Sequence, residues 1–245
     1  MSTAFLKKLT SPGSPGEDLS ESDRALLLAL SDDVQTFPAR RDIVREDERP
    51  EHVLLMIEGW AIRYKVVEKG GRQITAFLMP GDFCDTHVTM FDQMDHTIAS
   101  LNETKIALVP RAKILELLDR PALARSLWWA SLIDEAILRA WIVNLGRRDA
   151  YDRVGHLFCE LSQRLDTVGL VSDGQFALPL TQEDLADAVG LTSVHVNRIL
   201  KQFRDDGLLT FRHQHVTIAD PERLSQAIGF DANYLHLPSK KPHLN

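Results

Sequence analysis

The stretch TQEDLADAVGLTSVHVNRILKQF, residues 181–203, decides the fold of the C-terminal part of the chain. Thr181 is a good helix N-cap, and Asp184 stands three positions later, at the acidic position of a capping box. Gly190 ends this first helix, and Thr192 caps a second helix that begins at once. Two short helices joined by a tight glycine turn predict a helix-turn-helix motif.

The second of these helices has an apolar face and a polar face. The residues expected in the core of the motif are Leu185, Val189, Val196, Ile199, Leu200 and Phe203. The opposite side is in the register in which a recognition helix reads base edges, and it carries Ser193, Val194, Asn197, Arg198 and Lys201.

Each outward residue has an expected role and a plainer alternative. We expect Arg198 to donate to guanine, Val194 to touch a thymine methyl, and Asn197 to contact a base. The alternatives are that Arg198 is a solvated charge, that Val194 makes a minor core contact and that Asn197 faces water. Residues that contact only phosphate are also expected, on the helix and on a β-hairpin or wing that follows it. The predicted DNA-binding residues are Thr192, Ser193, Val194, His195, Asn197, Arg198, Lys201, Gln202 and Arg212.

Charge is distributed unevenly along the chain. The whole protein carries a net charge of −7, which argues against a protein held to DNA by charge alone. Residues 192–216, in contrast, hold four basic residues against two acidic ones. A sequence-specific binder needs positive charge only on the surface that meets phosphate, so the acidic total does not exclude one.

Length and composition place the chain among ordinary globular proteins. Its 245 residues are enough for two modest domains. No apolar run approaches the roughly 18 residues of a membrane span, so we expect a cytoplasmic protein that does not contact membranes. Cys84 and Cys159 lie far apart and fit neither a disulfide framework nor a metal site.

The middle of the chain changes from strand-like to helical periodicity. Residues 34–110 hold short alternating runs broken by turns, which predict a sandwich or small barrel. From Pro121 a long helix runs to about Leu145. One apolar stripe contains Ile133, Ile137 and Asn144, and another contains Leu138 and Trp141. We expect one stripe to pair with a second copy, with Asn144 fixing the register, and a helix buried all round is the alternative.

This order of elements, with the helix-turn-helix stretch and the motif GRQITAFLMPGDF at residues 71–83, resembles the Crp/Fnr family of bacterial transcription regulators. The resemblance implies an α+β fold and a homodimer that binds a palindromic site on double-stranded DNA, with RNA polymerase as a partner. The implied parts are a flexible arm (1–20), a jelly-roll-like β-roll sensor domain (21–120), a dimerisation helix (121–148), a winged helix-turn-helix domain (149–230) and a tail (231–245).

The ligand of the sensor domain needs its own argument. Cyclic-nucleotide-binding members of the family hold the ribose with a Gly-Glu pair and the phosphate with an Arg-Ser pair. The matching positions here are Asp85-Thr86 and His96-Thr97, and no arginine stands between Arg72 and Arg111. Since a buried phosphate needs such a partner, we expect no cyclic AMP binding. The candidate effector pocket comprises Gly81, Asp82, Phe83, Cys84, Asp85, Thr86, His96 and Thr97.

Other functions are weighed against this one. Cys84 and His87 resemble the haem ligands of the carbon-monoxide-sensing branch, and a buried cysteine beside a surface histidine is the alternative. Residues 1–30 hold no cysteine for an iron–sulfur cluster, and the single His-x-His pair is in the wing, so we expect no metal, no resident cofactor and no enzyme activity. An unidentified small-molecule effector remains the candidate ligand. A cyclic-nucleotide-type regulatory subunit that binds no DNA is the rival; it would not need Arg198 and Lys201.

Overall fold

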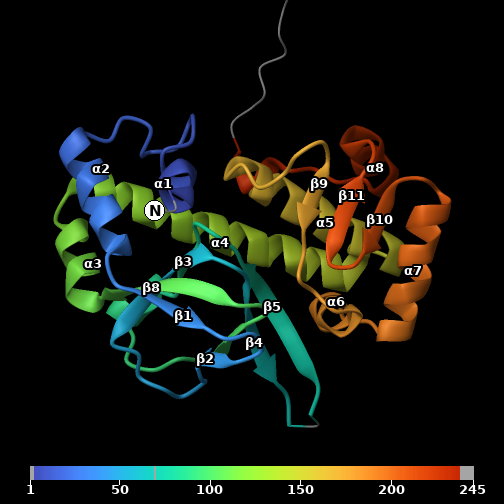
Figure 1. Ribbon diagram of the computed structural model, residues 1–245, viewed down its shortest axis with the longest axis horizontal. Coiled ribbons are helices and arrows are strands. Elements are labelled where there is room, and N and C mark those ends of the chain that lie inside the picture. Colours follow the sequence, from blue (N-terminus) through green and yellow to red (C-terminus); the bar gives the residue numbers. More distant parts are fainter. Residues whose placement is uncertain (1–2, 69, 238–245) are drawn as a thin grey trace, which may run out of the picture.

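The predicted β-roll is a pair of packed antiparallel sheets. The computed structural model describes residues 3–68 and 70–237. Each sheet has four strands, in the orders β1-β8-β3-β6 and β2-β7-β4-β5. Figure 1 shows both sheets beneath the long helix α4 (Pro121–Arg147). The strands are β1 Val34–Phe37, β2 Asp42–Val44, β3 His52–Glu58, β4 Ala61–Val66, β5 Arg72–Leu78, β6 Phe83–Cys84, β7 Thr97–Ser100 and β8 Thr104–Pro110.

Burial along the strands follows their sequence pattern only in part. The continuous apolar run of β3 is buried on both faces, because the second sheet covers one face and helices α1 (Ala4–Leu9) and α3 (Arg111–Leu118) contact the other side. Strand β4 does not alternate in burial: Ala61 and Ile62 are buried, and the strand becomes exposed toward its last residue, Val66. A short helix η2 (Thr86–Thr89) follows β6.

The N-terminal segment differs from the flexible arm predicted for residues 1–20. Over the described residues 3–20, helix α1 places Phe5 and Leu9 against the β-roll, where they are 0% and 2% exposed. The spacing of four residues puts both side chains on one face of the helix, which anchors it. Helix α2 (Glu21–Leu28) follows with Ser20 as its N-cap and leads into η1 (Ala29–Ser31).

Helix α4 is buried on one side only, so it is not a core helix covered all round. Its inner side packs on the β-roll and on α5 (Ala150–Thr167), and Trp141 belongs to this side, with its ring 5.9 Å from that of Phe77. The expected role of Asn144 in a helix pair is wrong: its amide is buried and donates to the carbonyl of Arg153, because α5 folds back beside it. Within the described residues, no helix is long and apolar enough to cross a membrane.

The C-terminal domain has the winged helix-turn-helix order that the sequence predicts. Its small sheet has the order β10-β11-β9. The elements after α5 are β9 Gln175–Ala177, α6 Gln182–Val189, α7 Ser193–Asp205, β10 Leu209–Arg212, β11 His215–Ile218, α8 Pro221–Ile228 and η3 Asn233–Leu235.

The start of the predicted tail is packed rather than loosely held. Leu235 is 1% exposed, and the Tyr234 hydroxyl donates to the buried Glu160 carboxylate at 2.9 Å. These contacts tie residues 231–237 to α5. Residues 238–245, the rest of the predicted tail, lie outside the described residues.

The buried His156 of α5 gives the domain a measurable acid sensitivity. Burial, with the charge of Arg148 as a smaller cause, lowers the pKa of His156 to about 4. Between pH 6.5 and 4 the unfolded chain therefore binds a proton that the folded chain does not. Because of this one group, lowering the pH from 6.5 to 4 reduces the free energy of unfolding by about 3 kcal/mol. We expect His156→Phe to remove this part of the pH dependence in urea unfolding.

The matched control is His52→Phe, at a half-buried position at the start of β3. It is expected to keep the slope of the unmodified protein. An unchanged slope in His156→Phe would contradict the buried neutral imidazole.

Candidate DNA-binding site and sensor pocket

The helix-turn-helix is built by the capping groups that the sequence predicts. The Thr181 hydroxyl accepts from the Asp184 backbone N–H at 3.1 Å, and the Asp184 carboxylate accepts from the Thr181 backbone N–H at 2.8 Å. Gly190 ends α6 in the left-handed conformation, with φ of 64°, which glycine adopts without steric cost. The Thr192 hydroxyl then accepts from the backbone N–H of His195 and caps α7.

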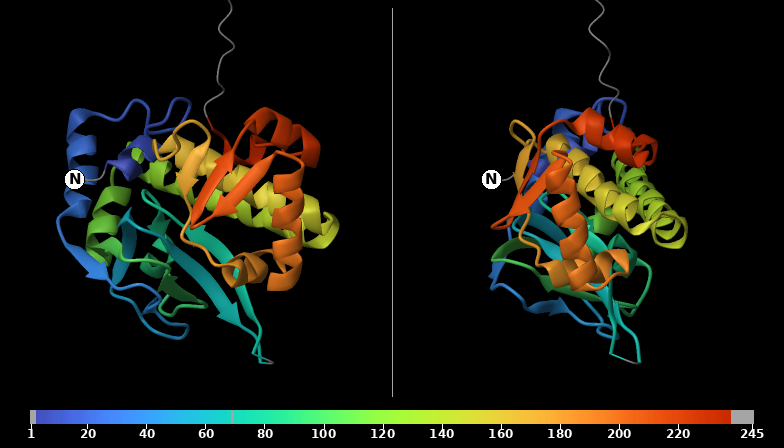
Figure 2. Two further views of the ribbon diagram at one scale, coloured as in Figure 1. Left: turned by 45° about the vertical axis from the view of Figure 1, so that its right-hand side comes forward. Right: turned by 90° about the vertical axis from the view of Figure 1, so that its right-hand side faces the viewer.

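The structure separates the two faces of α7 as predicted. Val196, Ile199, Leu200 and Phe203 are buried beneath it. The predicted DNA-binding residues are exposed, except for half-buried His195. Val194 is 70% exposed, which excludes a core contact for its side chain. Figure 2 shows α7 at the front of its right-hand view, uncovered by other elements.

The donors on this face have no partner within the part of the chain that the structure describes. Among the described residues, no hydrogen bond or ion pair involves the side chains of Asn197, Arg198, Lys201 or Gln202. The guanidinium of Arg198 therefore remains free to donate in a fork to one acceptor pair, which is the geometry that guanine offers in the major groove.

A hairpin beside α6 completes this surface. Strands β10 and β11 are joined through His213 and Gln214, whose φ values of 49° and 60° are those of a tight hairpin turn. A shallow hollow lies between this wing and the start of α6, with Thr181, Gln182 and Arg212 on its walls. The exposed Arg212 on this wing is typical of a phosphate contact.

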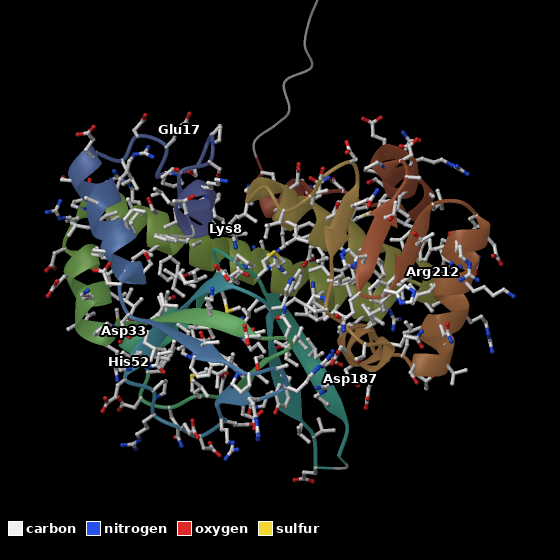
Figure 3. All side chains as sticks on the ribbon, in the orientation of Figure 1. Lys8, Glu17, Asp33, His52, Asp187 and Arg212 are labelled. Atoms are coloured by element: carbon white, nitrogen blue, oxygen red, sulfur yellow. The ribbon has the colours of Figure 1, made fainter. Side chains whose placement is uncertain are left out.

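A cluster of ion pairs, which we call the α6 latch, fixes the helix-turn-helix to the β-roll. Asp184 accepts from Arg40 at 2.8 Å and from Arg72 at 2.9 Å, and Arg72 Nε donates to Asp187 at 2.6 Å. Figure 3 shows Asp187 on α6 next to β5. Burial raises the pKa of Asp184, but the hydrogen bonds from Thr181 and Arg40 outweigh burial and hold that pKa below its ordinary value. The same carboxylate thus caps α6 and attaches it to the sensor domain.

The predicted effector residues only partly form one pocket. A cavity of about 230 Å³ lies between the β-roll, α1 and α4, and its walls include Gly81, Asp82, Phe83, Asp85 and Thr86. Cys84 points into the core behind it, and Thr97 instead accepts from the backbone N–H of Glu46. His96 does not line the cavity: its Nε2 lies 3.0 Å from the Asp85 carboxylate, and its ring centroid is 5.9 Å from that of His87, and both of these residues line the cavity.

Four charged residues that line the cavity, Lys8, Arg63, Asp134 and Glu135, are not among the predicted effector residues, and Arg63 and Asp134 matter most for its chemistry. Arg63, from β4, pairs with Asp85 at 2.9 Å, so a guanidinium is present although none stands near residues 85–97 in the sequence. Asp134, from α4, is half-buried and has no hydrogen bond or ion pair within the described residues. Burial and, more weakly, the charge of Asp82 raise its pKa. Neither residue lies near the predicted motif, so only the fold could reveal them.

Of the two possible haem ligands, Cys84 is in an unfavourable state for binding iron. Cys84 is 1% exposed within β6, and burial raises the pKa of its thiol well above the usual value. His87 is half-buried, and burial lowers its pKa, which favours the neutral imidazole that metals bind, so it does not count against haem. A haem-ligating cysteine is a thiolate. The buried side chain of Cys84 therefore favours the plain alternative.

The α6 latch makes a testable contribution to stability. Arg72→Met removes the hydrogen bonds to both Asp184 and Asp187 while keeping a long side chain, and we expect a loss of about 1–2 kcal/mol in urea unfolding. The control Lys105→Met removes an ion pair to Glu58 between exposed side chains and is expected to leave the midpoint unchanged. Equal effects of the two changes would show that the latch contributes no more than an ordinary surface pair.

Comparisons with known proteins agree with this architecture. Residues 34–121 match the family described as a cyclic nucleotide-binding domain, and residues 152–227 match the Crp-like helix-turn-helix domain. The nitrogen fixation regulation protein FixK of Bradyrhizobium diazoefficiens is 26% identical over 189 residues, which cover 77% of this chain and 78% of that protein. The fumarate and nitrate reduction regulatory protein of Escherichia coli is 24% identical over 171 residues, covering 69% and 68%.

A solved structure shows the same arrangement. FixK2 from Bradyrhizobium japonicum superimposes with a TM-score of 0.71 at 27% identity, over 79% of this chain and 95% of that structure. The two matched families together cover more than half of the present chain, in the order in which the β-roll and the helix-turn-helix occur. This chain therefore belongs to the Crp/Fnr family of transcription regulators.

Proposed function

We propose that this protein is a sequence-specific regulator of transcription that binds a palindromic DNA site as a homodimer. The observation that carries the proposal is the outer face of α7, where exposed donors without internal partners surround an exposed Val194. A solvent-facing valine among polar groups is suited to a thymine methyl, and Arg198 is suited to guanine. A regulatory subunit that binds no DNA would have no use for this face.

We propose that a second copy of this chain packs against the outer side of α4. Five large apolar side chains are exposed there: Trp128, Leu132, Leu138, Ile142 and Val143. Trp128 and Ile142 are 67% and 70% exposed, far more than a lone soluble helix normally leaves uncovered at repeated positions. Pairing two such helices buries both stripes and relates two α7 helices by a twofold axis, which is the symmetry of a palindrome.

The sensor domain is proposed to respond to a small molecule other than a cyclic nucleotide. At about 230 Å³, the cavity is below the roughly 300–1,000 Å³ of typical ligand pockets. Two cationic side chains that line it are already paired, Arg63 with Asp85 and Lys8 with Asp82, and Asp134 would face an incoming phosphate. A buried neutral Cys84 likewise disfavours resident haem. We also propose that the protein is located in the cytoplasm, where the DNA is, and that RNA polymerase is a partner.

Arg198→Ala tests the proposed base contact. On a duplex obtained by binding selection from random sequences, we expect a loss of about 1–3 kcal/mol in binding free energy, and much less on random DNA. Fluorescence anisotropy titration measures both affinities. The control Arg204→Ala changes an exposed arginine in the last turn of the same helix, so similar small losses are expected on both duplexes. Equal losses for Arg198→Ala on selected and random DNA would exclude base reading.

Ile142→Glu tests the proposed dimer. A charge placed in each half of a buried interface costs on the order of 3 kcal/mol, which corresponds to about a 100-fold higher dimer dissociation constant. Sedimentation equilibrium measures this constant, and circular dichroism checks that the fold is kept. The control is Val66→Glu, at an exposed apolar position on β4. A monomeric unmodified protein, or an Ile142→Glu dimer of undiminished strength, would refute pairing through α4.

A further inference from the structure

The N-terminal segment is built into the sensor domain at the cavity. Phe5 is fully buried and meets the ring of Phe83 edge-on, with centroids 6.2 Å apart. Leu9 is 2% exposed and forms part of the cavity wall. The chain then turns back over α1, where the buried Ser14 hydroxyl donates to the Leu9 carbonyl at 2.7 Å. Residues 3–19 thus form a folded strap over the cavity.

The turn before β6 is shaped to receive this strap. Gly81 has a φ of 95°, and a Cβ atom there would lie 2.9 Å from the backbone carbonyl carbon of Ala4. Only glycine permits this conformation together with so close an approach. The strap therefore rests directly on the turn that carries Asp82.

Asp82 is shared between the strap and the DNA-binding domain. The Lys8 ammonium of α1 pairs with one carboxylate oxygen, and the Arg164 guanidinium of α5 donates to the other at 3.0 Å. That second oxygen also accepts from the backbone N–H of Met79 at 2.9 Å. Asp82 and Arg164 are 4% and 7% exposed, so water competes little for these bonds. Figure 3 shows Lys8 between α1 and the centre of the molecule.

We infer that residues 3–19 are an intramolecular regulatory strap, whose docking through Lys8 on Asp82 controls both access to the sensor cavity and the attachment of α5 to the β-roll. This inference rests on the proposed function, because it names how the state of the cavity reaches the DNA-binding domain. A ligand that enters between Lys8 and Asp82 displaces the strap and changes the partners of Arg164. By linkage, anything that loosens the strap changes DNA affinity, and DNA binding changes the strap by the same factor.

Hydrogen–deuterium exchange of the full chain tests the coupling. Lys8→Met removes the ammonium but keeps a long side chain, and we expect about tenfold faster exchange both in residues 3–10 and at the α5 amides of residues 160–167. Lys7→Met makes the same change at the neighbouring exposed position, and Lys8→Arg keeps the charge. Both controls are expected to stay within about twofold of the unmodified protein.

DNA supplies the second arm of the experiment. Affinity for the selected duplex is expected to differ at least about threefold between Lys8→Met and Lys7→Met, and adding the duplex to the unmodified protein is expected to change exchange in residues 3–10. The second measurement needs no variant and holds even if Lys8→Met does not fold. Faster exchange confined to residues 3–10, with DNA affinity equal to the control, would overturn the inference.

The two proposals fail in different ways. If the unmodified protein selects no DNA sequence, the proposed function is wrong. Faster exchange in both residues 3–10 and residues 160–167 of Lys8→Met then still decides whether the strap and α5 are coupled. If DNA binding is selective but the strap responds neither to DNA nor to loss of the Lys8 charge, only the regulatory strap is wrong.

Discussion

The buried guanidinium of Arg164 is the contact on which the arrangement of this molecule depends. It donates to Asp82 of the β-roll and to the carbonyl of Phe77, each at 3.0 Å, and lies 3.4 Å from Glu160 of its own helix. A buried cation is costly unless its partners are in place, so these groups fix α5 strictly with respect to the sensor domain. Removing one partner would leave an uncompensated charge in the core. The contact between α5 and the β-roll therefore allows one arrangement of the two and also stabilises it.

From this point the remaining parts are positioned in turn. Trp141 of α4 donates to Glu160 at 3.0 Å, and Tyr234 reaches the same carboxylate from the C-terminal side. The α6 latch holds the helix-turn-helix to β5 at a second place. Two attachments, one at α5 and one at α6, set the direction of α7 relative to the apolar side of α4. Since that side is the proposed dimer interface, the same contacts set the geometry of a paired DNA reader.

The sequence predicted best those features that local chemistry determines. The capping box, Gly190 and the apolar face of α7 act within a few residues, and the structure confirms each of them. The packed strap, the inward Asn144 and the presence of Arg63 in the cavity all depend on contacts between residues far apart in the chain. The pairs Arg40–Asp184 and Lys8–Asp82 are separated by 144 and 74 residues, and no spacing rule anticipates them. Periodicity assigned α4 its length but not which apolar stripe faces the core.

Hydroxyl-radical footprinting of the unmodified protein on its selected duplex tests the central claim most directly, because it reports where two reading helices meet one DNA molecule. The account predicts two protected stretches related by a dyad, with centres about 10 base pairs, or one helical turn, apart. A single protected stretch, or protection without twofold symmetry, would contradict a dimer that presents two α7 helices to successive turns of the groove.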